Sequence, residues 1–131
     1  MEPNLETALE IAEVLVELSQ LEPMFHWPPA DMSRDALKEK TVDDFWEVGA
    51  SGRRYAREFV LDVLAQRQSK TEPDVWEISD LYCRQLADDI YLLTYTLLQD
   101  RTRLTRRATI WQRATEGWKI VYHQGTVVQD A

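Results

Sequence analysis

The chain has 131 residues, 44% of them hydrophobic and 29% charged, which is ordinary for a single folded domain spanning residues 1–131. No apolar run approaches the roughly 20 residues that cross a bilayer, and the first residues lack a signal peptide's basic and apolar regions, so no membrane association is expected. A net charge of −8 argues against a nucleic-acid partner, because phosphate neutralisation supplies most of the affinity there. The lone cysteine, Cys83, cannot form an internal disulfide, which suits a cytoplasmic protein.

The N-terminal part predicts an amphipathic helix over residues 5–21, capped by Asn4 and ended by Pro23. Its many glutamates, up to Glu22, are interpreted as a solvated face. The stretch at 25–29 is aromatic and rich in proline, so it is extended. We expect Phe25 or Trp27 to plug an opening in the core. His26 is either a ligand group at a pocket mouth or a hydrogen-bonded structural histidine.

The middle of the chain predicts a short helix over 34–40 capped by Ser33, then a strand over 42–48. Residues 49–52, Gly-Ala-Ser-Gly, form a turn, since they lack the lysine and spacing of a phosphate-binding loop. Ser51 is placed to cap a helix over 53–66.

The remainder is predicted to be β structure after a polar loop at 69–74. Strands are expected over 75–85 and 90–99, followed by a pair within 104–128 that is joined by a Glu116-Gly117 turn. Helices must then pack on one face of a curved, mostly antiparallel sheet. The predicted fold class is α+β, with three N-terminal helices on that sheet.

The register of the last strand pair decides which side chains face a pocket. With a Glu116-Gly117 turn, alternation places Arg107, Thr109, Trp111, Tyr122 and Gln124 on one face of the sheet. His123 then lies on the opposite face, with Ile110 and Val121. A one-residue change would reassign every side chain.

This order of elements resembles the nuclear transport factor 2-like superfamily, a cystatin-like cone that includes SnoaL-like cyclases and ketosteroid isomerases. It resembles most the bacterial domain-of-unknown-function 4440 branch. The resemblance covers almost the whole chain and rests on four blocks: 21–26 (LEPMFH), 44–52 (DFWEVGASG), 107–111 (RATIW) and 117–126 (GWKIVYHQGT). It implies a fold and a pocket but no agreed reaction. The isomerases' aspartate base and oxyanion-hole groups have no matching motifs, so steroid isomerase chemistry is not implied.

Acid–base chemistry needs titratable groups inside an apolar enclosure. Glu47 is the candidate base, and His123 or Tyr95 the candidate group that polarises a carbonyl. Alternatively, Glu47 pairs with an arginine and His123 makes a structural hydrogen bond. The spacing of histidines, cysteine and acids matches no metal site and no nucleophile motif, and no cofactor is expected.

We predict that the cone binds a small, partly apolar molecule. The candidate ligand-binding residues are Phe25, His26, Trp27, Phe45, Tyr55, Phe59, Arg107, Thr109, Trp111 and Gln124. Several arginines crowd residues 101–107, and they form either a charged hairpin tip or a contact for an anionic ligand or acidic partner. Both faces of the strand at 75–85 carry apolar side chains, which favours a homodimer through the sheet. The alternative function is a non-catalytic interaction or accessory module with a filled pocket.

Overall fold

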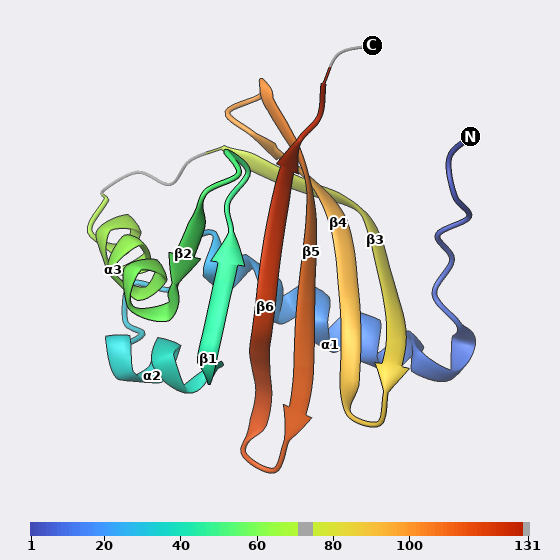
Figure 1. The fold of residues 1–131 in the computed structure, drawn as a ribbon, viewed down its shortest axis with the longest axis horizontal. Helices are drawn as coiled ribbons and strands as arrows, with labels where there is room; N and C mark the ends of the chain where they lie inside the picture. Colours follow the sequence, from blue (N-terminus) through green and yellow to red (C-terminus); the bar gives the residue numbers. More distant parts are fainter. Residues whose placement is uncertain (71–74, 130–131) are drawn as a thin grey trace.

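The computed structural model describes residues 1–70 and 75–129, and a six-stranded sheet with the order β2-β1-β6-β5-β4-β3 organises them (Figure 1). The strands are β1 (Thr41–Val48), β2 (Arg54–Ala56), β3 (Trp76–Ala87), β4 (Ile90–Gln99), β5 (Arg103–Ala114) and β6 (Gly117–Val127). Neighbouring strands are antiparallel except for β1 and β6, which are parallel. The α+β fold class predicted from the sequence is confirmed.

Helices supply the second layer of the core. The helix α1 (Ala12–Leu21) lies between the short 3-10 turns η1 (Leu9–Ile11) and η2 (Glu22–Phe25). It crosses behind the sheet in Figure 1, whereas α2 (Arg34–Glu39) and α3 (Arg57–Gln68) lie beside β1 and β2. The large side chains buried between the two layers are Leu18, Leu37, Leu61, Leu64, Leu93, Leu97, Trp111 and Ile120. Each such leucine contributes about 1.5–3 kcal/mol through its removal from water.

The first helix is shorter than predicted, since residues before Leu9 are not helical and Asn4 caps nothing. The Thr7 hydroxyl oxygen instead accepts a hydrogen bond from the backbone N–H of Cys83 in the edge strand β3, at 3.0 Å. An edge strand presents unpaired backbone donors, and this one recruits the N-terminal segment as a partner. The apolar periodicity of residues 5–21 predicts a helix but gives no information about this contact with β3, which lies far away in the sequence.

The second half of the helical region also differs from its prediction. Residues 54–56 form the short strand β2, antiparallel to β1, so the following helix begins at Arg57 and Ser51 does not cap it. By contrast, the helix at 34–39 begins as predicted, with the Ala36 N–H donating to the Ser33 hydroxyl oxygen at 3.0 Å. Of the predicted loop at 69–74, residues 71–74 lie outside the described residues.

The register of β5 and β6 corrects the predicted face assignment. The connecting loop is Thr115-Glu116, so Trp111 pairs with Ile120. The next pair is Ile110 with Tyr122, which leaves Val121 as an extra residue in β6. Because such a bulge reverses the alternation beyond it, His123 and Gly125 face inward while Tyr122 and Gln124 face outward. A bulge between Ser79 and Tyr82 likewise brings both Ile78 and Cys83 of β3 to the inner face.

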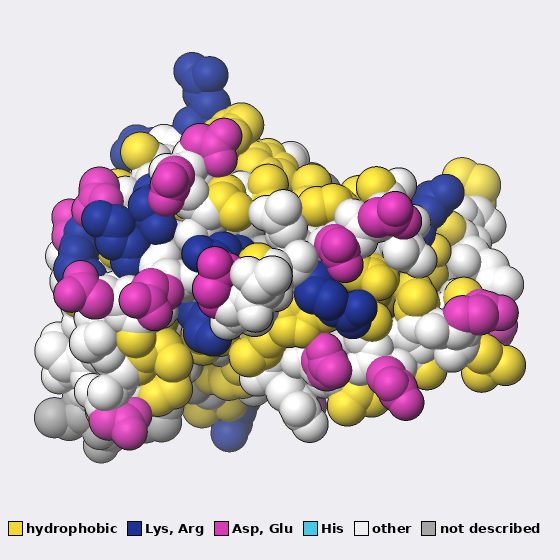
Figure 2. All heavy atoms as spheres, turned by 90° about the horizontal axis from the view of Figure 1, so that it is seen from below, with side chains coloured by type: hydrophobic (Ala, Val, Ile, Leu, Met, Phe, Trp, Pro, Cys, Tyr) yellow, Lys and Arg dark blue, Asp and Glu magenta, His cyan; other side chains and the backbone are white. Residues whose placement is uncertain are grey.

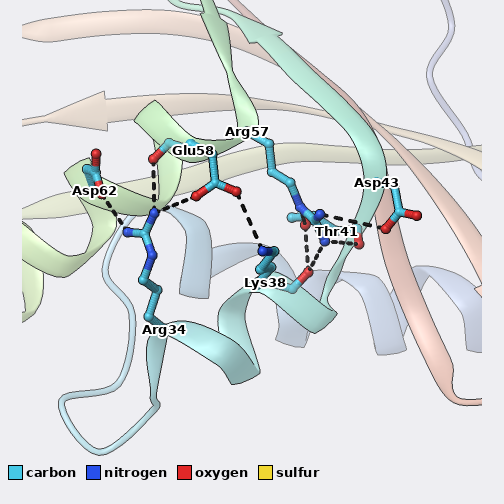
Figure 3. A network of polar contacts seen from close by, with 7 residues as sticks. All are labelled: Arg34, Lys38, Thr41, Asp43, Arg57, Glu58 and Asp62. Carbon is cyan, nitrogen blue, oxygen red and sulfur yellow. Dashed lines mark hydrogen bonds and ion pairs between the residues drawn. The ribbon is translucent and has the colours of Figure 1, made fainter.

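A polar network fastens α2 and α3 to the start of β1 (Figure 3). The guanidinium of Arg57 donates to the Thr41 hydroxyl oxygen at 2.7 Å, to the Lys38 carbonyl at 2.8 Å and to the Thr41 carbonyl at 3.2 Å. Thr41 is 1% exposed. Nearer the surface, Arg34 forms ion pairs with Glu58 at 2.8 Å and with Asp62 at 2.6 Å.

The lower surface of the molecule mixes apolar and charged side chains, as Figure 2 shows from below. Hydrophobic groups (yellow) are interspersed with acidic (magenta) and basic (dark blue) ones. Within residues 1–70 and 75–129, every helix is too short or too polar to cross a bilayer.

We predict that Arg57→Met lowers the free energy of unfolding by about 2 kcal/mol, because it leaves buried acceptors around Thr41 without a donor. Urea denaturation followed by tryptophan fluorescence measures the loss. Arg34→Met is the matched control and should cost below about 1 kcal/mol, since its ion pairs are exposed. Equal losses in the two variants would contradict this account of the network.

Candidate functional site

An open cavity of about 330 Å³ lies between α3, the β1–β2 hairpin and the inner face of the sheet. The side chains and backbone that line it come from Phe25, His26, Phe45, Glu47, Gly49, Ala50, Ser51, Tyr55, Phe59, Val60, Val63, Leu64, Arg67, Gln99, Arg103, Arg107, Ile120 and His123. This volume is at the lower end of the range for small-molecule sites, and it suits a ligand of one or two rings. The stacked rings of Tyr55 and Phe59, 4.7 Å apart, form an aromatic part of the wall.

Two strand pairings bring the candidate acid and base together. Glu47 of β1 pairs with His123 of β6, and His123 pairs with Thr109 of β5, so the three side chains form one row across the inner face. Glu47 and His123 both line the cavity. The β6 bulge is the reason that His123 reaches this row at all.

Behind that row lies Glu22, a carboxylate that is 0% exposed. Its Oε2 accepts hydrogen bonds from the Tyr95 hydroxyl at 2.6 Å and from the Thr109 hydroxyl at 2.8 Å. Its Oε1 accepts one from the Trp111 indole N–H at 3.0 Å. A buried carboxylate needs such donors, because an uncompensated charge in the core is costly.

The same hydroxyls connect Glu22 to both histidines. The Tyr95 hydroxyl lies 2.6 Å from Nε2 of His26, and the Thr109 hydroxyl lies 2.7 Å from Nδ1 of His123. With Glu22 ionised, both hydroxyl protons point to it, so each histidine must donate to the hydroxyl beside it. His26 then carries its proton on Nε2, and His123 carries its proton on Nδ1 with Nε2 as an acceptor.

Burial sets the charge of the titratable groups here. It lowers the pKa of His123 to about 3, assisted by the positive charges of Arg107 and Arg67. The pKa of His26 is also well below its usual value, through burial and then the nearby His123 and Arg107. Both imidazoles are therefore neutral at neutral pH. Burial raises the pKa of Glu47 above its usual value, against the opposing effect of Arg107 and Arg67.

The pKa of Glu22 is also raised by burial, while the hydrogen bonds from Tyr95, Thr109 and Trp111 and the charge of Arg107 act in the opposite direction. Two carboxyl groups with raised pKa values thus flank two neutral imidazoles. Titratable groups perturbed in this way, next to a cavity, are typical of functional sites.

The structure separates the predicted site residues into two sets. Those that line the cavity are Phe25, His26, Phe45, Glu47, Tyr55, Phe59, Arg107 and His123. Tyr95, Thr109 and Trp111 belong instead to the buried network around Glu22, where the Tyr95 hydroxyl donates to the carboxylate. Gln124 is exposed on the outer face, where its side-chain oxygen accepts from the Tyr122 hydroxyl. Trp27 also lies outside the cavity wall, below Lys70 at 6.0 Å.

Phe25 confirms the expectation that one aromatic residue of 25–29 packs into the core. Its ring meets the Trp111 ring edge-on at 6.3 Å. Arg67 of α3 holds this connection from the other side, donating to the carbonyls of Phe25 and His26 at 3.2 Å each.

Glu22 is the main residue that sequence reasoning misplaced, because it was assigned to the solvated acidic face. A signal was present, since Glu22 continues the i, i+4, i+8 line of the buried residues Val14 and Leu18. Arg67 was not identified either. Its one sequence signal is a position three residues after the buried Leu64 on the same helix face.

No protein-family model matches the chain, and no curated protein does. Solved structures share its fold. A candidate dehydratase of the nuclear transport factor 2-like family from Streptomyces avermitilis is 19% identical with a TM-score of 0.68, over 94% of this chain and 100% of that one. A candidate ketosteroid isomerase from Parabacteroides distasonis is 17% identical with a TM-score of 0.66, over 96% of each chain.

A third structure, an uncharacterised protein with a cystatin-like fold from Caulobacter vibrioides, is 14% identical with a TM-score of 0.65, over 92% of this chain and 89% of that one. At such identities the likeness establishes the fold and no activity. The chain therefore has the cystatin-like cone of nuclear transport factor 2-like proteins.

We predict that Glu22→Gln reverses the hydrogen bonds of the buried network. The amide oxygen still accepts from Trp111, but the amide N–H groups now donate to the hydroxyls of Tyr95 and Thr109, whose own protons turn towards the histidines. His123 should change from the Nδ1–H to the Nε2–H tautomer, and His26 from Nε2–H to Nδ1–H. Long-range proton–nitrogen NMR spectra of the imidazoles report this directly.

Glu17→Gln is the matched control, because Glu17 accepts a hydrogen bond from the Trp118 indole at 2.8 Å and has no recorded bond to the Glu22 network. It should leave both tautomers unchanged. Identical imidazole spectra in wild type and Glu22→Gln would show that Glu22 does not orient the histidines. A loss of about 1–3 kcal/mol in stability is expected for Glu22→Gln.

Proposed function

We propose that this protein binds a small, partly apolar molecule in the cavity and carries out proton-transfer chemistry on it, of the isomerase, lyase or cyclase type. The observation that carries the proposal is the adjacent pair Glu47 and His123, which lines an open cavity beside a buried carboxylate network. The dehydratase and isomerase assignments of two structural neighbours are in keeping with this class of reaction.

Glu47 is the proposed general base. Burial raises its pKa, which makes it a stronger proton acceptor than an exposed glutamate, while Arg107 and Arg67 favour its ionised form. Removal of a proton next to a carbonyl generates negative charge on the ligand, and the arginines around the cavity stabilise it. His123 presents an unprotonated Nε2, so it accepts a hydrogen bond from a ligand hydroxyl rather than donating one to a carbonyl.

The alternative function, an accessory module whose pocket is filled by its own aromatic side chains, has less support. Trp111 and Phe45 are buried in the core, yet about 330 Å³ remains open in front of them. We also propose a cytoplasmic location, in keeping with the single buried Cys83, and membership of the domain-of-unknown-function 4440 branch, on the sequence blocks that resemble it.

Proton exchange into a panel of small enolisable carbonyl compounds in D₂O, followed by proton NMR, tests the catalytic role. Glu47→Gln should slow protein-dependent exchange by about 100-fold or more, because the amide cannot take up the proton. The wild-type rate should rise with pH through the raised pKa of Glu47, since only the ionised form is a base. The matched control is Glu58→Gln, an exposed glutamate on α3 that pairs with Arg34. Equal exchange rates in Glu47→Gln and wild type would remove Glu47 as the base.

We further propose that the outer face of the sheet is covered by a second copy of the chain. Trp46 is 44% exposed on this face, and its ring lies 4.9 Å from that of Tyr122. The register places Ile110 and Leu92 in the same outward row. A row of this kind is more apolar than a water-facing sheet surface requires.

Trp46→Lys should shift the protein from dimer towards monomer, because it places a charge within the apolar row that is proposed to be covered. Sedimentation equilibrium over a range of concentrations measures the change. Leu86→Lys, which alters another exposed apolar residue near the end of β3, is the control and should leave the association unchanged. A wild-type protein that sediments as a monomer at all concentrations would contradict the proposal.

A further inference from the structure

The cavity is positively charged although the chain as a whole is strongly acidic. Its lining includes three arginines, Arg67, Arg103 and Arg107, and one carboxylate, Glu47. The two lining histidines do not add to the charge, because both have lowered pKa values. A cavity with excess positive charge in a protein of net charge −8 is not a consequence of composition. It favours an anionic ligand.

Of the three arginines, Arg103 and Arg107 lie on the inner face of β5, and Arg107 is the one next to the row of Glu47 and His123. Its Nε donates to the Thr105 hydroxyl oxygen at 2.9 Å. In the part of the chain that the structure describes, no other hydrogen bond of this guanidinium is recorded, and no carboxylate oxygen lies within 4.0 Å of it. Both Nη nitrogens are therefore available to the cavity.

The guanidinium of Arg107 packs against Gly125, where the absence of a side chain leaves room for it. Gly125 pairs with Arg107 across β5 and β6, and a Cβ atom added to it would lie 2.7 Å from Nη1 and 2.9 Å from Cζ of Arg107. Any other residue at this position would push the guanidinium away. The arginine thus lies flat against the backbone of β6, held at one end by Thr105, with its two-pronged end free.

We propose that the ligand carries a carboxylate, and that the Nη groups of Arg107 bind it as a two-point pair. This inference rests on the proposed function and narrows its substrate class. A planar carboxylate matches the fork of a guanidinium in both spacing and charge. The bound carboxylate would lie over Gly125, one same-face step, roughly 7 Å, along β6 from His123. Glu47 would then act on a carbon a few bonds from the carboxylate.

Arg107 does not form a direct ion pair with either of the two nearby carboxylates, Glu22 and Glu47. Glu22 has its oxygens occupied by Tyr95, Thr109 and Trp111, and Glu47 is more than 4.0 Å from the guanidinium. Both acids feel the charge of Arg107 at longer range, and Arg107 lowers the pKa of each. A mostly buried cation that makes no direct ion pair is expensive to maintain in the free protein, and a bound anion would remove that cost.

The test compares cinnamate with cinnamamide, two probes of equal shape of which one carries the charge. Isothermal titration calorimetry gives the affinities, and backbone amide NMR shifts at residues 47–51 and 123–125 show whether each probe occupies the cavity. Cinnamate should bind the wild-type protein about tenfold more tightly than cinnamamide, since a charge-assisted pair is stronger than a neutral one. Inorganic phosphate, run alongside, should shift these amides less than cinnamate does.

Four variants locate the effect. Arg107→Met keeps the side-chain stem but removes the charge, and Gly125→Ala displaces the guanidinium; each should abolish the preference for cinnamate. Arg106→Met is the matched control, because Arg106 faces outward, where it contacts Asp80 at 3.4 Å, and it should keep the preference. Glu47→Gln should bind cinnamate more tightly than wild type, because a like charge is removed.

The outcomes separate this inference from the proposed function. If cinnamamide binds in the cavity as tightly as cinnamate, or if Arg107→Met leaves the preference unchanged, the carboxylate assignment is wrong while small-molecule binding stands. If phosphate shifts the cavity amides more than cinnamate does, the site takes a different anion and the assignment is likewise wrong. If neither organic probe shifts the cavity amides, both proposals fail.

Discussion

The burial of one carboxylate determines the geometry of the site. Glu22 sits at the end of the N-terminal helical segment with no exposure, and hydrogen-bond donors from β4 and β5 converge on its two oxygens. An ionisable group at such a position is stable only if each of these donors is in place, so the helical layer and the sheet can associate in one register alone. Through Tyr95 and Thr109 the same constraint reaches His26 and His123. The orientation of two cavity side chains therefore depends on a residue that does not itself line the cavity.

Neighbouring rows of the inner face carry different kinds of polar side chain. The row of Glu47, His123 and Thr109 carries the titratable groups, and the row of Arg107 and Gly125 carries the positive charge. Both rows stand on long paired strands rather than on loops, which keeps the distance between the titratable groups and the arginine constant. The acidic exterior repels anions at long range, so the arginines act locally, where the cavity walls exclude water and strengthen their field.

The fold was predictable because it follows from patterns that the chain repeats. Alternating β-branched and aromatic residues identified the long strands, apolar periodicity with the Ser33 cap and Pro23 located the helices approximately, and the layer arrangement followed. Glu47, His123 and Arg107 were recognisable as polar residues in otherwise apolar strands. Glu22 was not, because a glutamate in an acid-rich helix has the same local signature whether water or a tyrosine hydroxyl solvates it. Its burial depends on Tyr95 and Thr109, far away in sequence.

The other wrong prediction was the assignment of the β6 side chains to the two faces of the sheet, and the bulge in β6 is its cause. Alternation assigns side chains to faces only while the strand is regular, and the extra residue at Val121 leaves no mark in the hydrophobic pattern. The predicted turn was also displaced, but by a step that preserves the alternation. The bulge alone brings His123 and Gly125 to the inner face in place of the predicted Tyr122 and Gln124. Hydrogen-bond register is a property of two strands together, so one strand's residues cannot reveal it.

That bulge gives β6 two possible inward-facing sets. If β6 instead continued in regular pairing beyond Ile120, Val121 would lie opposite Ile110, and the rest of the strand would turn over and bring Tyr122 and Gln124 to face the hollow. The imidazole would be replaced by a phenol, and the bare backbone under Arg107 by an amide side chain. No substitution would be needed for such a change. A one-residue shift of pairing, in a sheet that otherwise keeps its shape, would convert the chemistry of the cavity, which offers one physical route by which a single cone acquires unrelated activities.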